Sequence, residues 1–210
     1  HYPLRRQRQM CIRDSIGPDS MRFVSGTHRL DRHTNFAFVL PDDADHKIYL
    51  LDRFFDPPMD IYQNRLTTPF NLSAHARATT LIHEITHIKS LTEDLAYLDS
   101  MRPFPDLINV NISGSSAMKT DLTDLRENAL SLSTPISMLF RTWDAFTQEW
   151  QDFSSDNKKK VLSSTGCRTL EDARTVFMSN SDKRIDTILA NADSVTCMIT
   201  ELGRVLDEGA

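Results

Sequence analysis

The sequence lacks the features of a disulfide-stapled, membrane-spanning or nucleic-acid-binding protein. Its 210 residues include only three cysteines, Cys11, Cys167 and Cys197, which are far apart and in no metal-binding spacing. We therefore expect no disulfide framework, although a single Cys167–Cys197 bridge is left open. No apolar run approaches the roughly 20 residues of a transmembrane helix. The formal net charge of -5 argues against nucleic acid or an anionic membrane as the main partner.

What the sequence does contain is typical of a globular protein. Hydrophobic residues make up 40% and charged residues 25% of the chain, and its length suffices for one domain with a substantial core. The chain starts at His1 rather than methionine, and we expect it to be a piece of a longer protein. Its basic, aperiodic opening "HYPLRRQRQMCIRDS" resembles translated adapter read-through. We expect residues 1–15 to be non-native or disordered, and residues 16–210 to form one domain.

The first half of the chain predicts a small β element followed by a helix. The runs 35–40 and 46–55 have the apolar, β-branched and aromatic content of strands and are ended by Pro- and Asp-containing turns. Ser73 predicts the start of a helix over about 74–90. On that helix Leu81, Ile85 and Ile88 have the spacing of a core-facing stripe.

The second half predicts helices separated by loops. We expect a loop over 101–118, a helix over about 120–133, and a further helix to about 152 with Trp143 and Trp150 as core anchors. The polar stretch "SSDNKKK" (154–160) indicates a solvated linker. Thr169 with Asp172 resembles a capping box. A final helix is expected from about Ser181, because apolar residues keep a helical stripe for about seven turns.

The central helix carries the sequence His83-Glu84-Ile85-Thr86-His87. Histidines four apart on a helix point the same way and can reach one Zn²⁺ at about 2.0–2.1 Å. Glu84 lies beside them, where a carboxylate can take a proton from a water that the metal has made acidic. This H-E-x-x-H pattern is a metallopeptidase signal. The alternative is a chance pattern on a polar helix.

A zinc site of this kind needs a third protein ligand, and the sequence offers two candidates. Ser90 and Glu93 stand where the H-E-x-x-H-x-x-G-x-x-H plan requires glycine and histidine, so that plan fails. A glutamate from a later helix would be Glu127. An aspartate soon after the second histidine would be Asp94, in "TEDLAY".

The stretch Thr92-x-Asp94-x-x-Tyr97 resembles the core of the Gly-Thr-x-Asp-x-x-Tyr-Gly motif of the deuterolysin-like aspzincin peptidases. The likeness covers residues 46–135, from "KIYLLDRFF" to "RENALSLSTP". The last of these stretches resembles the family's downstream helix, which carries an Asn-Ala-Asp-x-Tyr pattern. It is nearest to the versions found in bacterial toxins and effectors. The resemblance implies that Asp94 is the third zinc ligand and that Tyr97 helps to hold the transition-state oxygen.

Three departures from the family accompany the resemblance. Leu91 and Leu98 replace both glycines of the motif, and the gap from His87 to Asp94 is short. The family's lysine preference is attributed to acidic residues on the downstream helix, and the matching positions here are Leu130 and Ser133. We therefore expect no strict lysine specificity.

Together these patterns predict a mainly α, α+β fold of the zincin type, with a small β element before the active-site helix and a helical C-terminal half. The expected function is a Zn²⁺-dependent endopeptidase with His83, His87 and Asp94 as ligands and Glu84 and Tyr97 as catalytic residues. The expected partner is a polypeptide, a target-cell protein if the toxin likeness holds, with no nucleic acid or membrane. We expect the protein to be secreted or delivered as part of a larger bacterial protein. The alternatives are a gluzincin-like peptidase that uses Glu127 and a non-catalytic zinc-binding or structural helical module.

Overall fold

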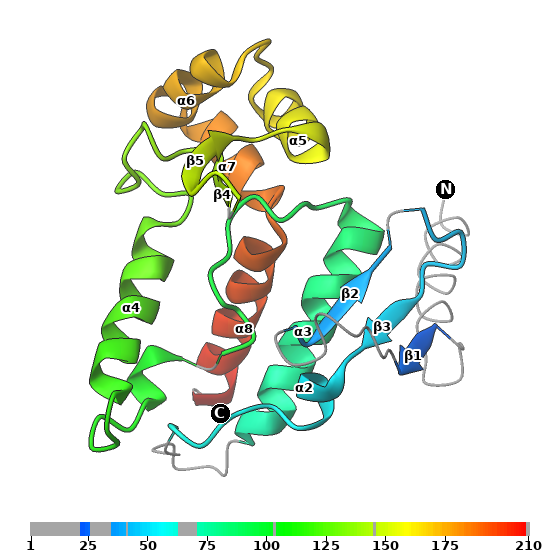
Figure 1. Ribbon diagram of the computed structural model, residues 1–210, viewed down its shortest axis with the longest axis vertical. Helices are drawn as coiled ribbons and strands as arrows, with labels where there is room; N and C mark the ends of the chain where they lie inside the picture. Colours follow the sequence, from blue (N-terminus) through cyan, green and yellow to red (C-terminus); the bar gives the residue numbers. More distant parts are fainter. Residues whose placement is uncertain are drawn as a thin grey trace. The chain divides into compact units, whose positions relative to one another are not determined.

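The structure is a computed structural model that describes residues 22–25, 35–40, 42–62, 71–102, 104–144 and 146–208, the last four without their side chains. These residues form seven α-helices and two small sheets, and about half of them are helical (Figure 1). The expectation of a mixed α+β fold rich in helix is confirmed. The chain divides into two compact units, residues 1–57 and 58–210, which are described separately. Residues 1–15 lie outside the described residues, and one domain over 16–210 stays a prediction.

The first unit contains a three-stranded sheet and a short helix. Strands β1 (Phe23–Ser25), β3 (Ile48–Leu50) and β2 (Ala37–Val39) lie in that order, with β1 parallel and β2 antiparallel to β3. Both expected strands are therefore present, and they pair with each other. The second strand is shorter than expected, because the chain turns into helix α2 (Asp52–Phe55).

In the second unit, helix α3 (Leu72–Ser90) is the long helix that the sequence predicts. Asn71, rather than Ser73, caps its start, with its side-chain oxygen accepting a hydrogen bond from the Ala74 amide at 2.9 Å. The predicted core face is wrong. Leu81, Ile85 and Ile88 are only half-buried, whereas the buried face consists of small and polar residues: Ala76, Thr79, Thr80, His83, Glu84 and Thr86.

That polar face is buried because α3 packs along α8 (Ala192–Glu208), with which it lies side by side (Figure 1). The residues at 0% exposure on the two helices include Thr79 and Thr80 on α3 and Ala192 and Thr196 on α8. Their small side chains permit close approach, and each threonine hydroxyl donates to a carbonyl three or four residues back. The buried hydroxyls are thereby satisfied without a partner on the other helix.

The predicted continuous C-terminal helix is in fact two helices. Helix α7 (Ser181–Leu189) ends before α8 begins, and Ala190 and Asn191 connect them. Only part of the predicted apolar stripe is buried. Ala192 is at 0% exposure and Ile188 packs against the main core, whereas Ile185, Leu189, Ile199 and Leu202 are between 42% and 59% exposed. The apolar periodicity runs through the break, which therefore could not be seen from the pattern alone.

The helix predicted to reach residue 152 is also wrong. Strands β4 (Arg141–Asp144) and β5 (Glu149–Asp152) form an antiparallel hairpin in which Trp143 pairs with Trp150. Their rings meet edge to face at 5.7 Å between centroids, and the two residues are 50% and 48% exposed. They stabilise the hairpin as a cross-strand pair and are not core anchors.

Three short helices and the hairpin enclose the main core. The polar stretch predicted as a linker instead opens α5 (Ser155–Thr165), and α6 (Leu170–Ser179) follows. Thr169 caps α6 as expected, because its hydroxyl oxygen accepts a hydrogen bond from the Asp172 amide at 3.1 Å. The Asp172 carboxylate accepts from the Thr169 hydroxyl at 2.7 Å, so only the first half of a capping box is formed. Helices α5, α6 and α7 pack against one another around a cluster of buried residues: Leu95, Leu130, Leu139, Phe140, Phe153, Val161, Leu170, Ala173, Phe177 and Ala190.

Helix α4 (Ser115–Asn128) starts and ends earlier than the predicted 120–133. A short 3₁₀ turn, Pro105–Leu107, lies in the segment predicted to be loop. Beside them a second apolar cluster contains Tyr62, Phe104, Leu107, Ile108 and Leu122. Within the described residues, no helix is both long and apolar enough to cross a membrane.

Candidate metal centre

Helix α3 presents the two histidines of the H-E-x-x-H pattern on one face. The Nε2 atoms of His83 and His87 lie 3.1 Å apart, and their rings are nearly perpendicular. Each Nδ1 faces an acceptor that cannot donate: Asp193 Oδ1 at 2.8 Å for His83, and the Thr92 carbonyl at 2.9 Å for His87. Both rings therefore carry their proton on Nδ1 and direct Nε2 toward a common point.

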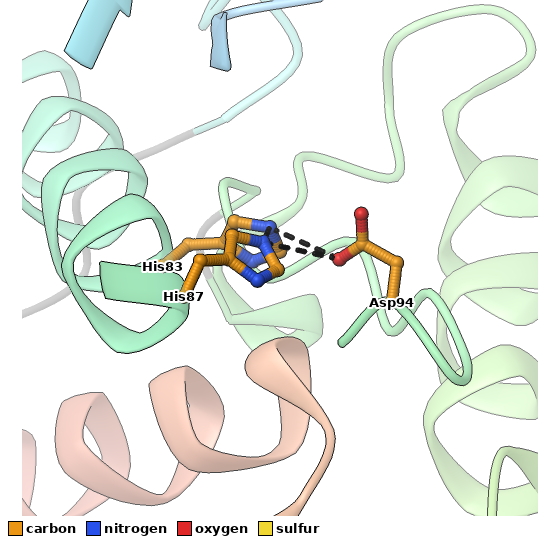
Figure 2. A group of neighbouring side chains, drawn as sticks. All are labelled: His83, His87 and Asp94. Atoms are coloured by element: carbon orange, nitrogen blue, oxygen red, sulfur yellow. Dashed lines mark hydrogen bonds and ion pairs between the residues drawn. The ribbon is translucent and has the colours of Figure 1, made fainter. Parts of the chain in front are cut away.

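Asp94 completes the cluster. Its Oδ1 lies 3.3 Å from His83 Nε2 and 3.4 Å from His87 Nε2 (Figure 2). Four ligands at about 2.05 Å around a tetrahedral ion stand about 3.3–3.4 Å from one another, so the three observed separations match one face of such a tetrahedron. The buried Oδ1 also makes no well-aligned hydrogen bond to any described residue. These three side chains could hold a metal ion.

The turn that returns Asp94 to the histidines is tight, as the short sequence gap requires. Leu91 ends α3 in the left-handed region, with φ 51°, and its side chain is 68% exposed. This is a position where the family motif has glycine, and the conformation costs leucine roughly 1–2 kcal/mol. Leu98, at the other glycine position, is not among the described residues with positive φ. The backbone therefore requires glycine-like freedom at one of the two replaced positions and not at the other.

Thr92 fastens this turn to α3. Its hydroxyl lies 2.8 Å from the hydroxyl of Thr86, and its carbonyl accepts the hydrogen bond from His87. Both threonines are buried. The same residue thus holds the turn and orients the second histidine.

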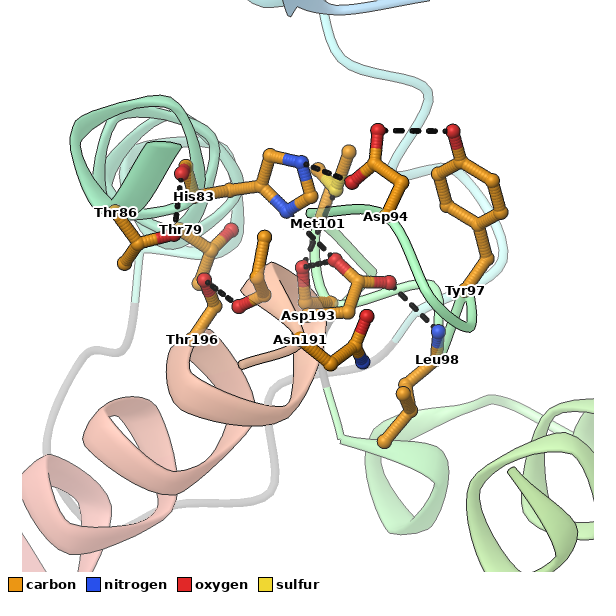
Figure 3. Close-up of polar contacts among 12 residues, drawn as sticks. Thr79, His83, Thr86, Asp94, Tyr97, Leu98, Met101, Asn191, Asp193 and Thr196 are labelled. Atoms are coloured by element: carbon orange, nitrogen blue, oxygen red, sulfur yellow. Dashed lines mark hydrogen bonds and ion pairs between the residues drawn. The ribbon is translucent and has the colours of Figure 1, made fainter. Parts of the chain in front are cut away.

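Asp193, at the start of α8, is the site residue that the sequence analysis missed (Figure 3). It is 0% exposed. Besides the bond from His83, its carboxylate accepts hydrogen bonds from the Ser100 hydroxyl and the Leu98 amide, both at 2.6 Å. A signal existed, because the Asn-Ala-Asp sequence that the family resemblance places downstream occurs letter for letter at 191–193. The stretch chosen for that resemblance, 126–135, contributes no residue to the cluster.

The electrostatics of the cluster match a cation site. Although burial raises it, the pKa of Asp94 lies well below its usual range because of the two histidines. Burial lowers the pKa of His83, but the hydrogen-bonded Asp193 and then Asp94 outweigh it and raise that pKa to about 10. The pKa of His87 is raised, since Asp94 and the Thr92 carbonyl outweigh burial. Without a metal His83 therefore holds a second proton at neutral pH, and a metal ion would displace it.

Glu84 follows His83 on α3 and is only 4% exposed. Burial raises its pKa to about 6, although the two histidines oppose the shift. No hydrogen bond or ion pair engages its carboxylate within the part of the chain that the structure describes. Glu84 is thus a buried carboxylate with a pKa of about 6 and no hydrogen-bond partner among the described residues.

Tyr97 lies on the outer side of the cluster. Its hydroxyl donates to Asp94 Oδ2 at 3.1 Å, and the residue is 61% exposed (Figure 3). Desolvation and the neighbouring Asp94 carboxylate raise the pKa of Tyr97 above its usual value, so the phenol keeps its proton at neutral pH. The structure therefore brings together all five residues that the sequence singled out.

The other acidic residues considered above do not belong to the cluster. Glu127 is exposed on α4 and is not part of the cluster. Glu93 is half-buried beside Asp94, but it does not belong to the cluster either, and its backbone pairs with residues of the α7–α8 junction. Leu130, one of the two positions matched to the family's acidic residues, is buried in the main core. The geometry selects Asp94 as the third candidate ligand.

Comparisons with known proteins add no relative. No protein-family model, no curated protein and no solved structure matches the chain.

Proposed function

We propose that the protein is a zinc-dependent endopeptidase of the zincin type, similar to the deuterolysin-like aspzincins. The observation that carries the proposal is the arrangement of His83, His87 and Asp94, whose ligating atoms have the separations of a tetrahedral site. Two imidazoles and one carboxylate suit Zn²⁺, and three protein ligands with an open fourth position are typical of a catalytic rather than a structural zinc.

In this proposal each remaining residue has a defined task. Bound zinc would polarise the scissile carbonyl and make a water molecule acidic. Glu84 would take a proton from the attacking water and pass it to the leaving amine. Its raised pKa and the lack of a hydrogen-bond partner among the described residues support this task. The Tyr97 hydroxyl, once released from Asp94, donates to the oxygen that becomes negatively charged.

The substrate in this proposal is a polypeptide, and strict lysine specificity is not expected. The likeness to toxin and effector domains extends the proposal to a target-cell protein as substrate and to delivery within a larger bacterial protein. A peptide-library cleavage profile dominated by lysine after the scissile bond would contradict the expected lack of specificity.

The test combines metal content with cleavage of an unstructured protein such as casein. We expect about one zinc per chain by elemental mass spectrometry, and cleavage that a chelator abolishes. Glu84→Gln should keep the zinc and lose the cleavage, whereas the matched control Glu93→Gln should keep both. Zinc without cleavage in the wild type would identify a non-catalytic zinc-binding module. Absence of zinc after reconstitution would mean that the H-E-x-x-H pattern arose by chance.

A further inference from the structure

The junction between α7 and α8 carries two polar residues that are fully buried. Asn191 and Asp193 are both 0% exposed, and together they contact the chain on both sides of the cluster. We infer that these two positioning residues hold two of the three ligands, Asp94 and His83, in place before any metal binds. The inference rests on the proposed metal site and concerns how that site is built.

Asn191 fixes the segment that carries Asp94. Its Oδ1 accepts hydrogen bonds from the Leu95 amide at 2.9 Å and the Ala96 amide at 3.0 Å, and its Nδ2 donates to the Ala96 carbonyl at 2.9 Å. These residues lie in no helix or strand, so a side chain supplies the partners that secondary structure would otherwise supply. An amide can both accept and donate in this way, whereas a carboxylate or an apolar side chain cannot.

The backbone on either side of Asn191 fixes the residue before Asp94. The Glu93 amide donates to the Ala190 carbonyl at 2.9 Å, and the Ala192 amide donates to the Glu93 carbonyl at 3.1 Å. This pairing is available because the helix is interrupted at 190–191, which exposes backbone groups that a continuous helix would use itself. Asp94 therefore lies between neighbours that are held from both sides.

Asp193 fixes His83. The carboxylate itself cannot rotate freely, because Ser100 and the Leu98 amide bond its two oxygens while His83 donates to Oδ1. A carboxylate in this position sets the tautomer and the ring orientation of a histidine ligand. One three-residue stretch, 191–193, thus orients ligands that come from two different elements, α3 and the turn after it.

The experiment measures ligand positioning separately from metal binding. The variants are Asn191→Ala and Asp193→Asn, with Asn128→Ala and Asp186→Asn as controls at exposed positions of α4 and α7. The first measurement is amide hydrogen exchange of the metal-free chain at residues 95, 96 and 98. The second is Zn²⁺ affinity by competition with a chromophoric chelator, at a temperature where every variant is folded.

We expect Asn191→Ala to speed exchange at Leu95 and Ala96, because its side chain binds these amides. The looser Asp94 segment should weaken Zn²⁺ binding about 10–100-fold, the range for losing a group that orients a metal ligand. Asp193→Asn should weaken Zn²⁺ binding by a similar factor while Leu95 and Ala96 stay protected. The controls should match the wild type in both measurements. A general structural role would instead speed exchange throughout the chain.

Wild-type Zn²⁺ affinity in the folded Asn191→Ala and Asp193→Asn variants would overturn the inference. If Asn191→Ala does not fold, Asn191→Asp replaces it, because it keeps the acceptor for Leu95 and Ala96 and loses the donor to the Ala96 carbonyl and to the Ser194 hydroxyl. Its expected exchange at these two amides is then close to that of the wild type.

If the wild type binds no zinc, the proposed function fails. The exchange measurements still decide whether Asn191 positions the Asp94 segment, and unchanged exchange at Leu95 and Ala96 in Asn191→Ala would refute that positioning.

Discussion

Zinc should stabilise the folded chain, and this stabilisation should depend on Asp94. At a free zinc concentration of about 1,000 times the dissociation constant, a single site stabilises the folded state by about 4 kcal/mol. For a chain of this size each kcal/mol raises Tm by about 2–4 °C. The wild type should therefore melt about 8–16 °C higher in zinc than in chelator.

Asp94→Ala removes the oxygen that lies 3.3 and 3.4 Å from the two Nε2 atoms. Losing a partner of a ligand costs about 10–100-fold in affinity, so losing the ligand itself should cost at least about 100-fold. At the same zinc concentration the remaining stabilisation is then at most about 1.4 kcal/mol, which corresponds to a shift of about 3–6 °C. Glu127→Ala, the matched control for the other candidate ligand, should keep the full shift.

Differential scanning fluorimetry of each variant, in zinc and in chelator, gives the zinc-dependent part of Tm directly. This difference removes any effect that the substitution has on the metal-free protein. An Asp94→Ala variant with the full wild-type shift would refute Asp94 as a ligand. A shift lost in Glu127→Ala would favour the gluzincin-like alternative.

Three further predictions test other parts of the structure. Trp143→Ala should cost about 0.2–1 kcal/mol in urea unfolding, because the Trp143–Trp150 pair is half exposed; a loss of about 3–5 kcal/mol would instead indicate a core anchor. Tyr97→Phe should lower kcat about 100-fold and leave the zinc content unchanged, so a variant without zinc would mean that the phenol serves to hold Asp94. Burial lowers the pKa of His75 to about 4, and the charge of Arg126 adds to this shift. The contribution of neutral His75 to the free energy of unfolding is therefore complete above pH 6.5. That contribution, up to about 3 kcal/mol, should be lost as pH falls from 6.5 to 4, and a His75→Gln variant with the same pH dependence of unfolding as the wild type would contradict it.

Several features could be predicted from the sequence because they depend on residues close together in the chain. The facing of His83 and His87 follows from helical geometry, and the approach of Asp94 follows from a turn only a few residues long. The cap at Thr169 is equally local. The apolar runs likewise predicted the two strands β2 and β3, which are close together in the chain and pair with each other.

Other features depended on tertiary packing. Trp143, Phe146 and Trp150 have a spacing that fits a helix, yet the chain forms a hairpin there, because periodicity over a short segment does not separate the two. Packing of α8 against α3 buries the polar face of α3. No property of α3 alone indicates that partner. The apolar stripe over 185–206 likewise concealed the break between α7 and α8.

By itself the sequence determined which side chains could ligate a metal and which carboxylate could act as a base. Only the tertiary structure decided how they are held, because Asp193 lies about a hundred residues along the chain from His83, and Asn191 about as far from the Leu95 amide that it binds. Such a contact leaves no local periodicity and no fixed spacing in the chain. It exists because packing of α8 against α3 brings the α7–α8 junction to the His83, His87 and Asp94 cluster, where buried polar groups require partners.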